Sequence, residues 1–257
     1  MSSPALKITF LGTGTSSGVP MIACPCEVCS STDPKDKRLR SSIMVESAET
    51  TLVVDTTPDF RGQMLREHVK KLDAILFTHP HKDHVAGLDD IRGFNYFQKR
   101  PVDVYANELT QKALKNEFHY IFAEHKYPGI PDINLFDITG PFTVGDIPVI
   151  PVKAWHLKMP VLGFRFGNFT YITDANRIDE EEKKKIQGSK IMVLNALRHK
   201  EHISHFTLQQ AVDLAKELEV PQAYFTHISH QLGLHGEVNK TLPQGYELAF
   251  DGLQFEI

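Results

Sequence analysis

The feature that most constrains this 257-residue chain is a histidine-rich segment, Thr78–His84, that follows the apolar run Ala74–Phe77. A short apolar run of this kind is typical of a buried strand, and a tight turn after it brings neighbouring side chains together. Imidazole and carboxylate groups are the ligands that zinc and related divalent ions prefer. The segment therefore predicts a metal site at a strand end, built from His79, His81, Asp83 and His84.

Three further residues of ligand type, His156, Asp174 and His227, each follow a run that is typical of a strand. Taken alone, His156 would fit an aromatic cluster with Trp155, and Asp174 would fit the start of an Asx turn. A carboxylate, unlike a neutral imidazole, can bridge two cations with its two oxygens. Because these strand ends accompany the histidine-rich segment, the sequence predicts that all three side chains join one metal site.

The three cysteines of the chain, Cys24, Cys26 and Cys29, lie within six residues of one another. An odd number in one short segment does not favour a disulfide framework. Zinc in a closed site takes four ligands, and three cysteines with one histidine are a common set. We expect a zinc-binding loop at about residues 20–40, and the alternative is a loop with three reduced cysteines.

Composition narrows the location and the partners of the chain. The net charge of −4 gives no overall attraction to nucleic acid or to an anionic membrane. No apolar run approaches the roughly 20 residues that cross a bilayer, and the N-terminal residues lack the charged and apolar regions of a secretion signal. We therefore expect a cytoplasmic protein with no membrane partner.

Strands and helices alternate in two similar halves, which favours sheets packed face to face with helices outside, in the α+β class. We expect a single domain over residues 1–257, and Thr207 as the N-cap of one helix. The expected strands are 7–11, 42–46, 51–55, 74–77, 102–106, 142–152, 163–166, 170–172, 191–194 and 222–225. The expected helices are 59–71, 84–97, 109–122, 179–187 and 207–218.

The order of these ligand-type residues resembles the signature of the metallo-β-lactamase superfamily, and the resemblance extends over nearly the whole chain. Asp55, after the run Leu52–Val54, matches the usual strand-end aspartate of that family. The resemblance implies a four-layer αββα sandwich with a binuclear metal centre at one edge of its two sheets. In that centre one metal would be bound by His79, His81 and His156, the other by Asp83, His84 and His227, and Asp174 would bridge them.

Finer features are similar to the cyclic-phosphate phosphodiesterases of the carbon–phosphorus lyase pathway. The segment Leu11–Pro20 and the cysteine spacing resemble the opening of those enzymes, and Thr226–His230 resembles their closing motif. This implies that His230 joins the three cysteines around a structural zinc. The segment Ser204–Thr207 resembles one that supplies a further active-site histidine, here His205, in those enzymes and in ribonuclease Z.

The implied activity is that of a metal-dependent phosphodiesterase acting on a small phosphodiester, with a cyclic ribose phosphodiester among the candidates. Two divalent ions, zinc or manganese, would lower the pKa of a bridging water, and the hydroxide would attack phosphorus. His205 and Asp83 are the candidate catalytic residues, with His205 protonating the leaving oxygen, and Asp55 would orient a ligand histidine. The resemblance also implies a homodimer.

Residues outside the predicted metal sites are candidates for contacts with the substrate. Arg38, Arg40 and Ser41 are placed to contact a phosphate, although a basic run is usually a solvated loop. Asp59 and Arg61 are candidates for shaping the pocket, and a carboxylate and salt bridge at the start of a helix explain them equally well.

Other functions remain open. Ribonuclease Z shares the ligands, but its family usually has a Gly/Pro-rich basic arm for transfer RNA, which has no counterpart here, and the net charge does not favour binding a phosphate backbone. Thioesterases, lactonases and β-lactamases share the ligands without requiring the cysteine cluster. A zinc-binding module without activity is the remaining alternative, and the complete ligand set argues against it.

Overall fold

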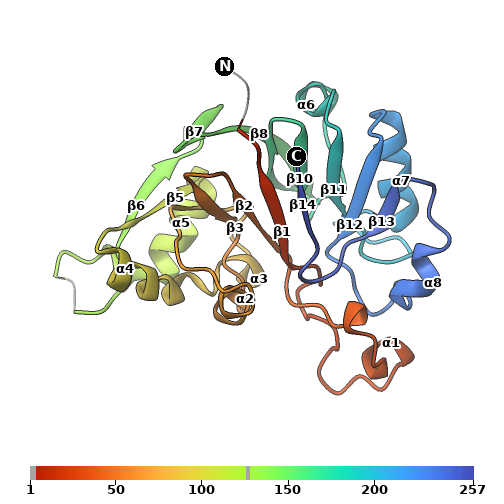
Figure 1. Ribbon diagram of the computed structural model, residues 1–257, viewed down its shortest axis with the longest axis horizontal. Helices are drawn as coiled ribbons and strands as arrows, with labels where there is room; N and C mark the ends of the chain where they lie inside the picture. The colour runs from red at the N-terminus through yellow and green to blue at the C-terminus, as the bar shows by residue number, and fades with distance from the viewer. Residues whose placement is uncertain (1–3, 126–127) are drawn as a thin grey trace.

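The computed structural model describes residues 4–125 and 128–257, and within them two seven-stranded sheets pack face to face (Figure 1). The first sheet contains β1 (Lys7–Gly12), β2 (Ser42–Glu46), β3 (Thr51–Val54), β4 (Ala74–Leu76), β5 (Val102–Ala106), β6 (Ile133–Asp137) and β14 (Gln254–Glu256). The second contains β7 (Phe142–Val144), β8 (Ile147–His156), β9 (Met159–Phe166), β10 (Phe169–Ile172), β11 (Ile191–Asn195), β12 (Gln222–Thr226) and β13 (Tyr246–Leu248). Their strand orders are β14-β1-β2-β3-β4-β5-β6 and β13-β12-β11-β10-β9-β8-β7.

Helices cover the outer faces of both sheets (Figure 1). The α-helices are α1 (Glu27–Ser30), α2 (Phe60–Arg66), α3 (Lys82–Val85), α4 (Arg92–Gln98), α5 (Glu108–Glu117), α6 (Glu180–Ile186), α7 (Leu208–Glu217) and α8 (His235–Asn239). The short 3₁₀ helices are η1 (Pro34–Asp36), η2 (Leu88–Ile91) and η3 (His119–Phe122). This arrangement confirms the predicted four-layer αββα fold.

The alternation of side chains along each strand explains the four layers. In β2, Ile43 and Val45 face the core between the two sheets, whereas Met44 belongs to the core under α2 and α5. In β11, Val193 lies between the sheets and Met192 packs under the helices of the second sheet. Because successive residues of a strand point to opposite faces, a strand buried on both faces is apolar at nearly every position.

The topology gathers the predicted ligands at one edge of the two sheets. β3 and β4 are parallel neighbours, and so are β10, β11 and β12, so their carboxyl ends point the same way within each sheet. Asp55 follows β3, Asp174 follows β10 and His227 follows β12, while the histidine-rich segment follows β4 and His156 is the last residue of β8. Ligand sites commonly lie at the carboxyl ends of parallel strands.

The prediction of one continuous helix over residues 84–97 is wrong, because the chain there forms α3, η2 and α4 in succession. The break follows from the packing of Gly87 against the loop after β3. The amide of Gly87 donates to the carbonyl oxygen of Thr56 at 2.9 Å, and a Cβ at this position would lie 2.2 Å from the carbonyl oxygen of Thr57. The chain therefore approaches this loop too closely to continue as one regular helix.

Other differences concern element ends and short elements. The predicted helix 59–71 ends at Arg66, and the predicted helix 109–122 consists of α5 followed by η3. The N-cap prediction for Thr207 is confirmed, since its side chain and that of Gln210 form a capping box at α7. The sequence did not predict β6, β13, β14 or α8. Among the described residues, no helix has both the length and the apolar character that crossing a membrane requires.

Candidate metal centres

Three of the predicted site residues adopt a backbone conformation that is uncommon for residues other than glycine. The φ angles of Asp55, Asp174 and His227 are +67°, +54° and +55°. The left-handed region costs such residues about 1 kcal/mol or more each, and residues held there cluster at functional sites. Each turns the chain sharply just beyond its strand, within one cluster at the edge of the sheets.

Asp174 lies at the centre of that cluster. One carboxylate oxygen, Oδ2, lies 2.6 Å from Nε2 of His84, and the other, Oδ1, lies 2.9 Å from Nε2 of His227. Asp83 completes this group, with Oδ2 3.2 Å from Nε2 of His84. The four residues offer ligand atoms that all lie within 4.8 Å of one another. They form the geometry expected for one metal-binding group.

A second group shares Asp174. His156 and His205 offer ligand atoms within 4.8 Å of each other and of Asp174, and Nδ1 of His205 lies 3.3 Å from Oδ1 of Asp174. The rings of His79 and His81 lie beside this group, with the His81 centroid 5.0 Å from that of His156 and 4.6 Å from that of His79. The other six predicted ligands therefore gather around the carboxylate of Asp174, and His205 lies among them.

In three of these histidines a hydrogen bond to a neighbouring residue uses Nδ1 as the donor, which leaves Nε2 without a proton. Asp55 accepts from Nδ1 of His84 at 2.7 Å and from the hydroxyl of Thr78 at 2.8 Å. Because the Thr78 hydroxyl donates to Asp55, the contact of 2.9 Å between its oxygen and Nδ1 of His79 requires the ring to donate. Nδ1 of His156 donates to the carbonyl oxygen of Ser204 at 3.0 Å. This is the tautomer that a metal-binding histidine needs, and Asp55 is the predicted orienting residue.

The charges of the cluster also fit a cation. Burial would raise the pKa of Asp174, but His227 and His84 lower it well below its ordinary value. Burial would lower the pKa of His84, but the carboxylates around it raise it far above its ordinary value. Within residues 4–125 and 128–257, Nε2 of His79, Nε2 of His84 and Nδ1 of His205 face the carboxylate of Asp174 and have no other hydrogen-bond partner, and Nδ1 of His227 has none. Unpaired buried nitrogens facing ionised carboxylates are what divalent ions would satisfy.

His205 is more strongly perturbed than a surface histidine. Burial and the neighbouring His227 lower its pKa to about 3. Its ring stacks on that of His227, with centroids 4.9 Å apart, and lies 4.6 Å from that of His156. The structure thus brings the candidate proton donor into contact with the predicted ligands. Its role as an acid stays a prediction.

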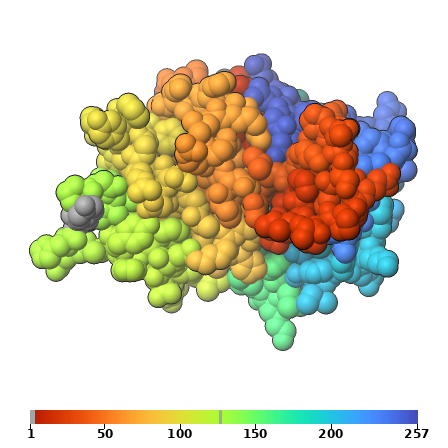
Figure 2. All heavy atoms as spheres, turned by 90° about the horizontal axis from the view of Figure 1, so that it is seen from below, coloured from red at the N-terminus to blue at the C-terminus, as the bar shows by residue number. Residues whose placement is uncertain are grey.

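The cysteine cluster forms a second, separate candidate site. The sulfur atoms of Cys24 and Cys26 each lie 3.3 Å from Nδ1 of His230, and Cys29 completes a group of four ligand atoms within 4.8 Å. The contact with His230 and the amide of Cys29 lower the pKa of Cys26 to about 6, which favours the thiolate that binds zinc. Figure 2 shows the red segment that contains these cysteines against the blue C-terminal part of the chain.

The predicted substrate contacts divide into two kinds. Arg38 is buried, and its guanidinium donates to Oγ1 of Thr13 at 2.8 Å and to the carbonyl oxygen of Ala249 at 2.6 Å. Ser41 is also buried and donates to the carbonyl oxygen of Gly14. These two residues hold the N-terminal loop in place and are not available to a substrate, so that prediction is wrong for them. The reason is burial, which a basic run in the sequence does not reveal.

Arg40 and Asp59 form an ion pair, with Nη1 3.0 Å from Oδ1. The salt bridge named as the alternative explanation of Asp59 is therefore present. Arg61 lines a surface groove between α2 and α4. The sequence also missed Thr15, whose hydroxyl lies 3.1 Å from Nε2 of His227. Its position in a glycine-rich loop after a strand was the only signal that pointed to it.

Comparisons with known proteins agree with this geometry. The family model of the beta-lactamase superfamily domain matches residues 50–228. A solved diphosphatase of the PhnP family is 43% identical, covers 98% of both chains and superposes with a TM-score of 0.92. Zinc-bound PqqB from Methylobacterium extorquens is 18% identical, with 98% of this chain and 100% of that chain covered and a TM-score of 0.77, which shows a shared fold.

A curated octanoyltransferase from Porphyromonas gingivalis is 37% identical over 253 residues. The match covers 97% of this chain and 51% of that protein, so this chain spans about half the length of that relative. The family match covers most of the chain, and it includes both the histidine-rich segment and Asp174. The chain therefore belongs to the metallo-β-lactamase superfamily, and its similarity to the PhnP-family diphosphatase extends over nearly its whole length.

Proposed function

We propose that this protein is a metal-dependent phosphodiesterase that hydrolyses a small phosphodiester. The observation that carries the proposal is the sharing of Asp174 by two groups of buried ligand atoms. Two divalent ions, zinc or manganese, would supply a hydroxide nucleophile at neutral pH and would neutralise the charge of the phosphate. The cysteine cluster would hold a third ion, a structural zinc.

The residues of the cluster would bind the two ions in two sets. Asp83, His84 and His227 would hold one ion, and His79, His81 and His156 would hold the other, with Asp174 between them. Asp55 would keep His84 in the required tautomer through its hydrogen bond of 2.7 Å. Asp83 is less buried than Asp174 and is the carboxylate on the accessible side of the cluster. A small substrate fits the proposal better than nucleic acid, since the net charge is −4.

His205 would protonate the oxygen that leaves phosphorus. An alkoxide is a poor leaving group unless it receives a proton, and a histidine can provide one. The pKa of His205 is low in the absence of substrate, because burial and His227 disfavour the charged ring. An anionic phosphodiester beside the ring would raise this pKa, since a nearby negative charge favours imidazolium.

A diphosphatase is the second candidate, because a protein 43% identical over 98% of its chain is described as one. The two activities place different demands on His205. A phosphate that leaves from a diphosphate is already a good leaving group, whereas an alkoxide requires protonation. Acyl substrates such as thioesters and lactones remain the less favoured alternatives, and a zinc-binding module without activity would cleave none of these substrates.

One experiment tests the proposal and separates the candidates. Wild-type protein and a His205→Ala variant, with metal content measured for both, are assayed on cyclic ribose phosphodiesters, bis(p-nitrophenyl) phosphate, a diphosphate ester and a thioester. We expect about three metal ions per chain and cleavage of the phosphodiesters. The variant should lose about 10²-fold or more on alkoxide-leaving substrates and little on the p-nitrophenyl ester.

The outcomes that count against the proposal are distinct. Cleavage of diphosphates alone favours the second candidate, and no cleavage with zinc or manganese favours a protein without activity. A single metal ion per chain contradicts the binuclear centre. Intact turnover of alkoxide-leaving substrates by the variant contradicts the acid role of His205, while the phosphodiesterase proposal itself would stand.

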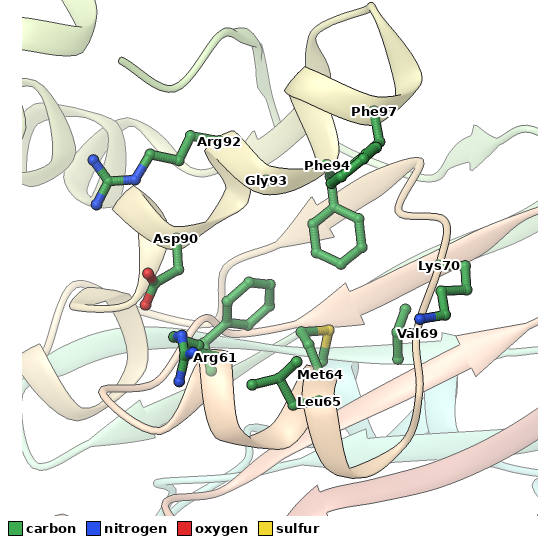
Figure 3. A pocket seen from close by; sticks show the side chains of 11 residues that line it. Arg61, Met64, Leu65, Val69, Lys70, Asp90, Arg92, Gly93, Phe94 and Phe97 are labelled. Atoms are coloured by element: carbon green, nitrogen blue, oxygen red, sulfur yellow. The ribbon is translucent and has the colours of Figure 1, made fainter. Parts of the chain in front are cut away.

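We also propose that the protein forms a homodimer through the groove between α2 and α4 (Figure 3). The groove has a volume of about 660 Å³, and Phe60, Met64 and Phe94 line its apolar part. Phe97 is 81% exposed and Leu65 is 59% exposed beside it. An apolar patch of this kind on a protein surface is typical of an interface.

The charges at the rim of the groove suit a second copy of the chain. Arg61 and Asp90 lie at the same end of the groove (Figure 3). Neither side chain forms an ion pair with another residue in the described part of the chain. In a two-fold interface, residue i of one copy meets residue j of the other and the reverse, so Arg61 and Asp90 would pair twice.

Sedimentation or light scattering of the purified protein tests this interface. We expect a dimer for the wild type and a folded monomer for Phe97→Glu, because Phe97 is mostly exposed in the single chain. Leu109→Glu, at an exposed apolar residue of α5 outside the groove, is the control and should remain dimeric. A monomeric wild type at all concentrations, or a dimeric Phe97→Glu variant, would overturn the proposal.

A further inference from the structure

The side chain of Asn176 joins two loops of the metal cluster. Its Oδ1 accepts from the amide of Leu157 at 3.0 Å, and its Nδ2 donates to the carbonyl oxygen of Ile203 at 2.9 Å. Leu157 directly follows His156, and Ile203 lies two residues before His205. Asn176 itself lies two residues after Asp174. One amide group therefore connects the three chain segments that supply the second group of ligand atoms.

Packing contributes little at the two residues that Asn176 contacts, although Phe206 anchors the second of these loops in the core. Ile203 is 72% exposed and Leu157 is 50% exposed, so neither side chain anchors its loop in a core. Leu157 also has a φ of +58°, a left-handed conformation that is unfavourable for a leucine. A loop with exposed side chains and a strained residue depends on its hydrogen bonds to keep one geometry. The amide of Asn176 supplies one such bond to each loop.

The hydrogen bond to Ile203 also acts on His156. The next carbonyl group after that of Ile203 belongs to Ser204, and it accepts from Nδ1 of His156 at 3.0 Å. Holding Ile203 in place therefore holds the acceptor that selects the tautomer of His156. A metal-binding histidine depends on such a partner for its ring orientation and its basicity. Asn176 thus acts on His156 from both sides, through the amide of Leu157 and through the Ser204 carbonyl group.

We infer that Asn176 is a positioning residue that sets the placement of His156 and His205 around Asp174. The inference rests on the proposed metal centre, and it does not depend on which substrate is hydrolysed. An asparagine suits this position because it offers one acceptor and one donor at the same time. Aspartate would keep the acceptor for Leu157 and would place an oxygen against the carbonyl oxygen of Ile203. Alanine would remove both bonds.

The test measures metal binding to Asn176→Ala and Asn176→Asp by titration with Co²⁺ against a competing chelator, with Co²⁺ absorption spectra to follow coordination. We expect the affinity of one of the two cluster ions to fall by about tenfold or more, with an altered spectrum at that site. The other cluster ion and the metal at the cysteine cluster should bind as in the wild type. Asn168→Ala, in the exposed turn between β9 and β10, is the matched control.

Kinetics supply a second readout that general destabilisation would not produce. We expect both variants to lower kcat with KM nearly unchanged on a substrate that the wild type cleaves, while unfolding temperature falls only slightly. Unchanged affinity for both cluster ions in Asn176→Ala would overturn the inference, as would an equal weakening of every metal site. Because the metal titration needs no substrate, its result stands even if the proposed activity is wrong.

Discussion

An Asp174→Asn variant should lose phosphodiester turnover by about 10³-fold or more, because the substitution removes the carboxylate that the two ligand groups share. Asparagine keeps the volume of the side chain and removes its charge. In the native protein the two oxygens of Asp174 lie 2.6 Å and 2.9 Å from ring nitrogens of His84 and His227. Each of two ions would therefore lose an anionic ligand, and the binding of at least one ion should fall.

Metal analysis and thermal unfolding with and without added metal would check this prediction alongside the assay. Ions that bind only the folded state raise the unfolding temperature, so the wild type should gain stability from added zinc or manganese. Asp174→Asn should gain less. Asp213→Asn, at an exposed position of α7, is the matched control and should behave as the wild type. If Asp174→Asn kept two cluster ions and wild-type turnover, the shared-carboxylate model would be wrong.

The sequence was most informative where local chemistry and local structure coincide. The apolar run before Thr78–His84 predicts a strand, and the turn after it carries several residues of ligand type. One segment therefore predicts both the strand and a metal site at its end. The same holds for Asp174 and His227, which follow β10 and β12. The burial of His205 within the cluster followed only from the resemblance, because nothing in its immediate sequence brings it to His156.

The sequence failed where tertiary contacts determine the outcome. The periodic apolar residues of 84–97 favour a continuous helix, but the close approach of Gly87 to the loop at Thr57 breaks it. The edge strands β6 and β14 were missed because an edge strand packs on fewer neighbours, and many of their side chains are exposed. The sequence favours an exposed position for Arg38, because basic residues are usually solvated. Its burial is explained by its hydrogen bonds to Thr13 and Ala249, which are distant in the sequence.

The second large effect that we expect concerns the cysteine cluster. Cys29→Ser should remove one zinc ion per chain, because it takes away one of four ligands of a closed site. The apolar contacts of this loop are few, since its buried cluster contains only Val19, Val28 and Cys29. We therefore expect a bound zinc to contribute much of what holds the loop against the C-terminal segment that carries His230.

The cost should stay smaller than in a zinc finger, because the two sheets have their own large cores and the loop can open without them. We expect the unfolding temperature to fall by about 5–10 °C, which corresponds to a loss on the order of 2–3 kcal/mol in a chain of this size. Trypsin should cut the loop at Lys35 and Lys37 faster in the variant than in the wild type. Both cuts should occur while the rest of the chain is still folded. Zinc content, unfolding temperature and timed proteolysis measure these effects together.

Ser30→Ala is the matched control for this experiment, since Ser30 is exposed in the same loop and offers no ligand to the cluster. It should keep the zinc content, the unfolding temperature and the cleavage rate of the wild type. Cys29→Ser with an unchanged zinc content and an unchanged cleavage rate would show that the cysteines are not zinc ligands. A loss of zinc without faster cleavage would show instead that hydrogen bonds, such as that from the amide of His235 to Asp36, hold the loop without the metal.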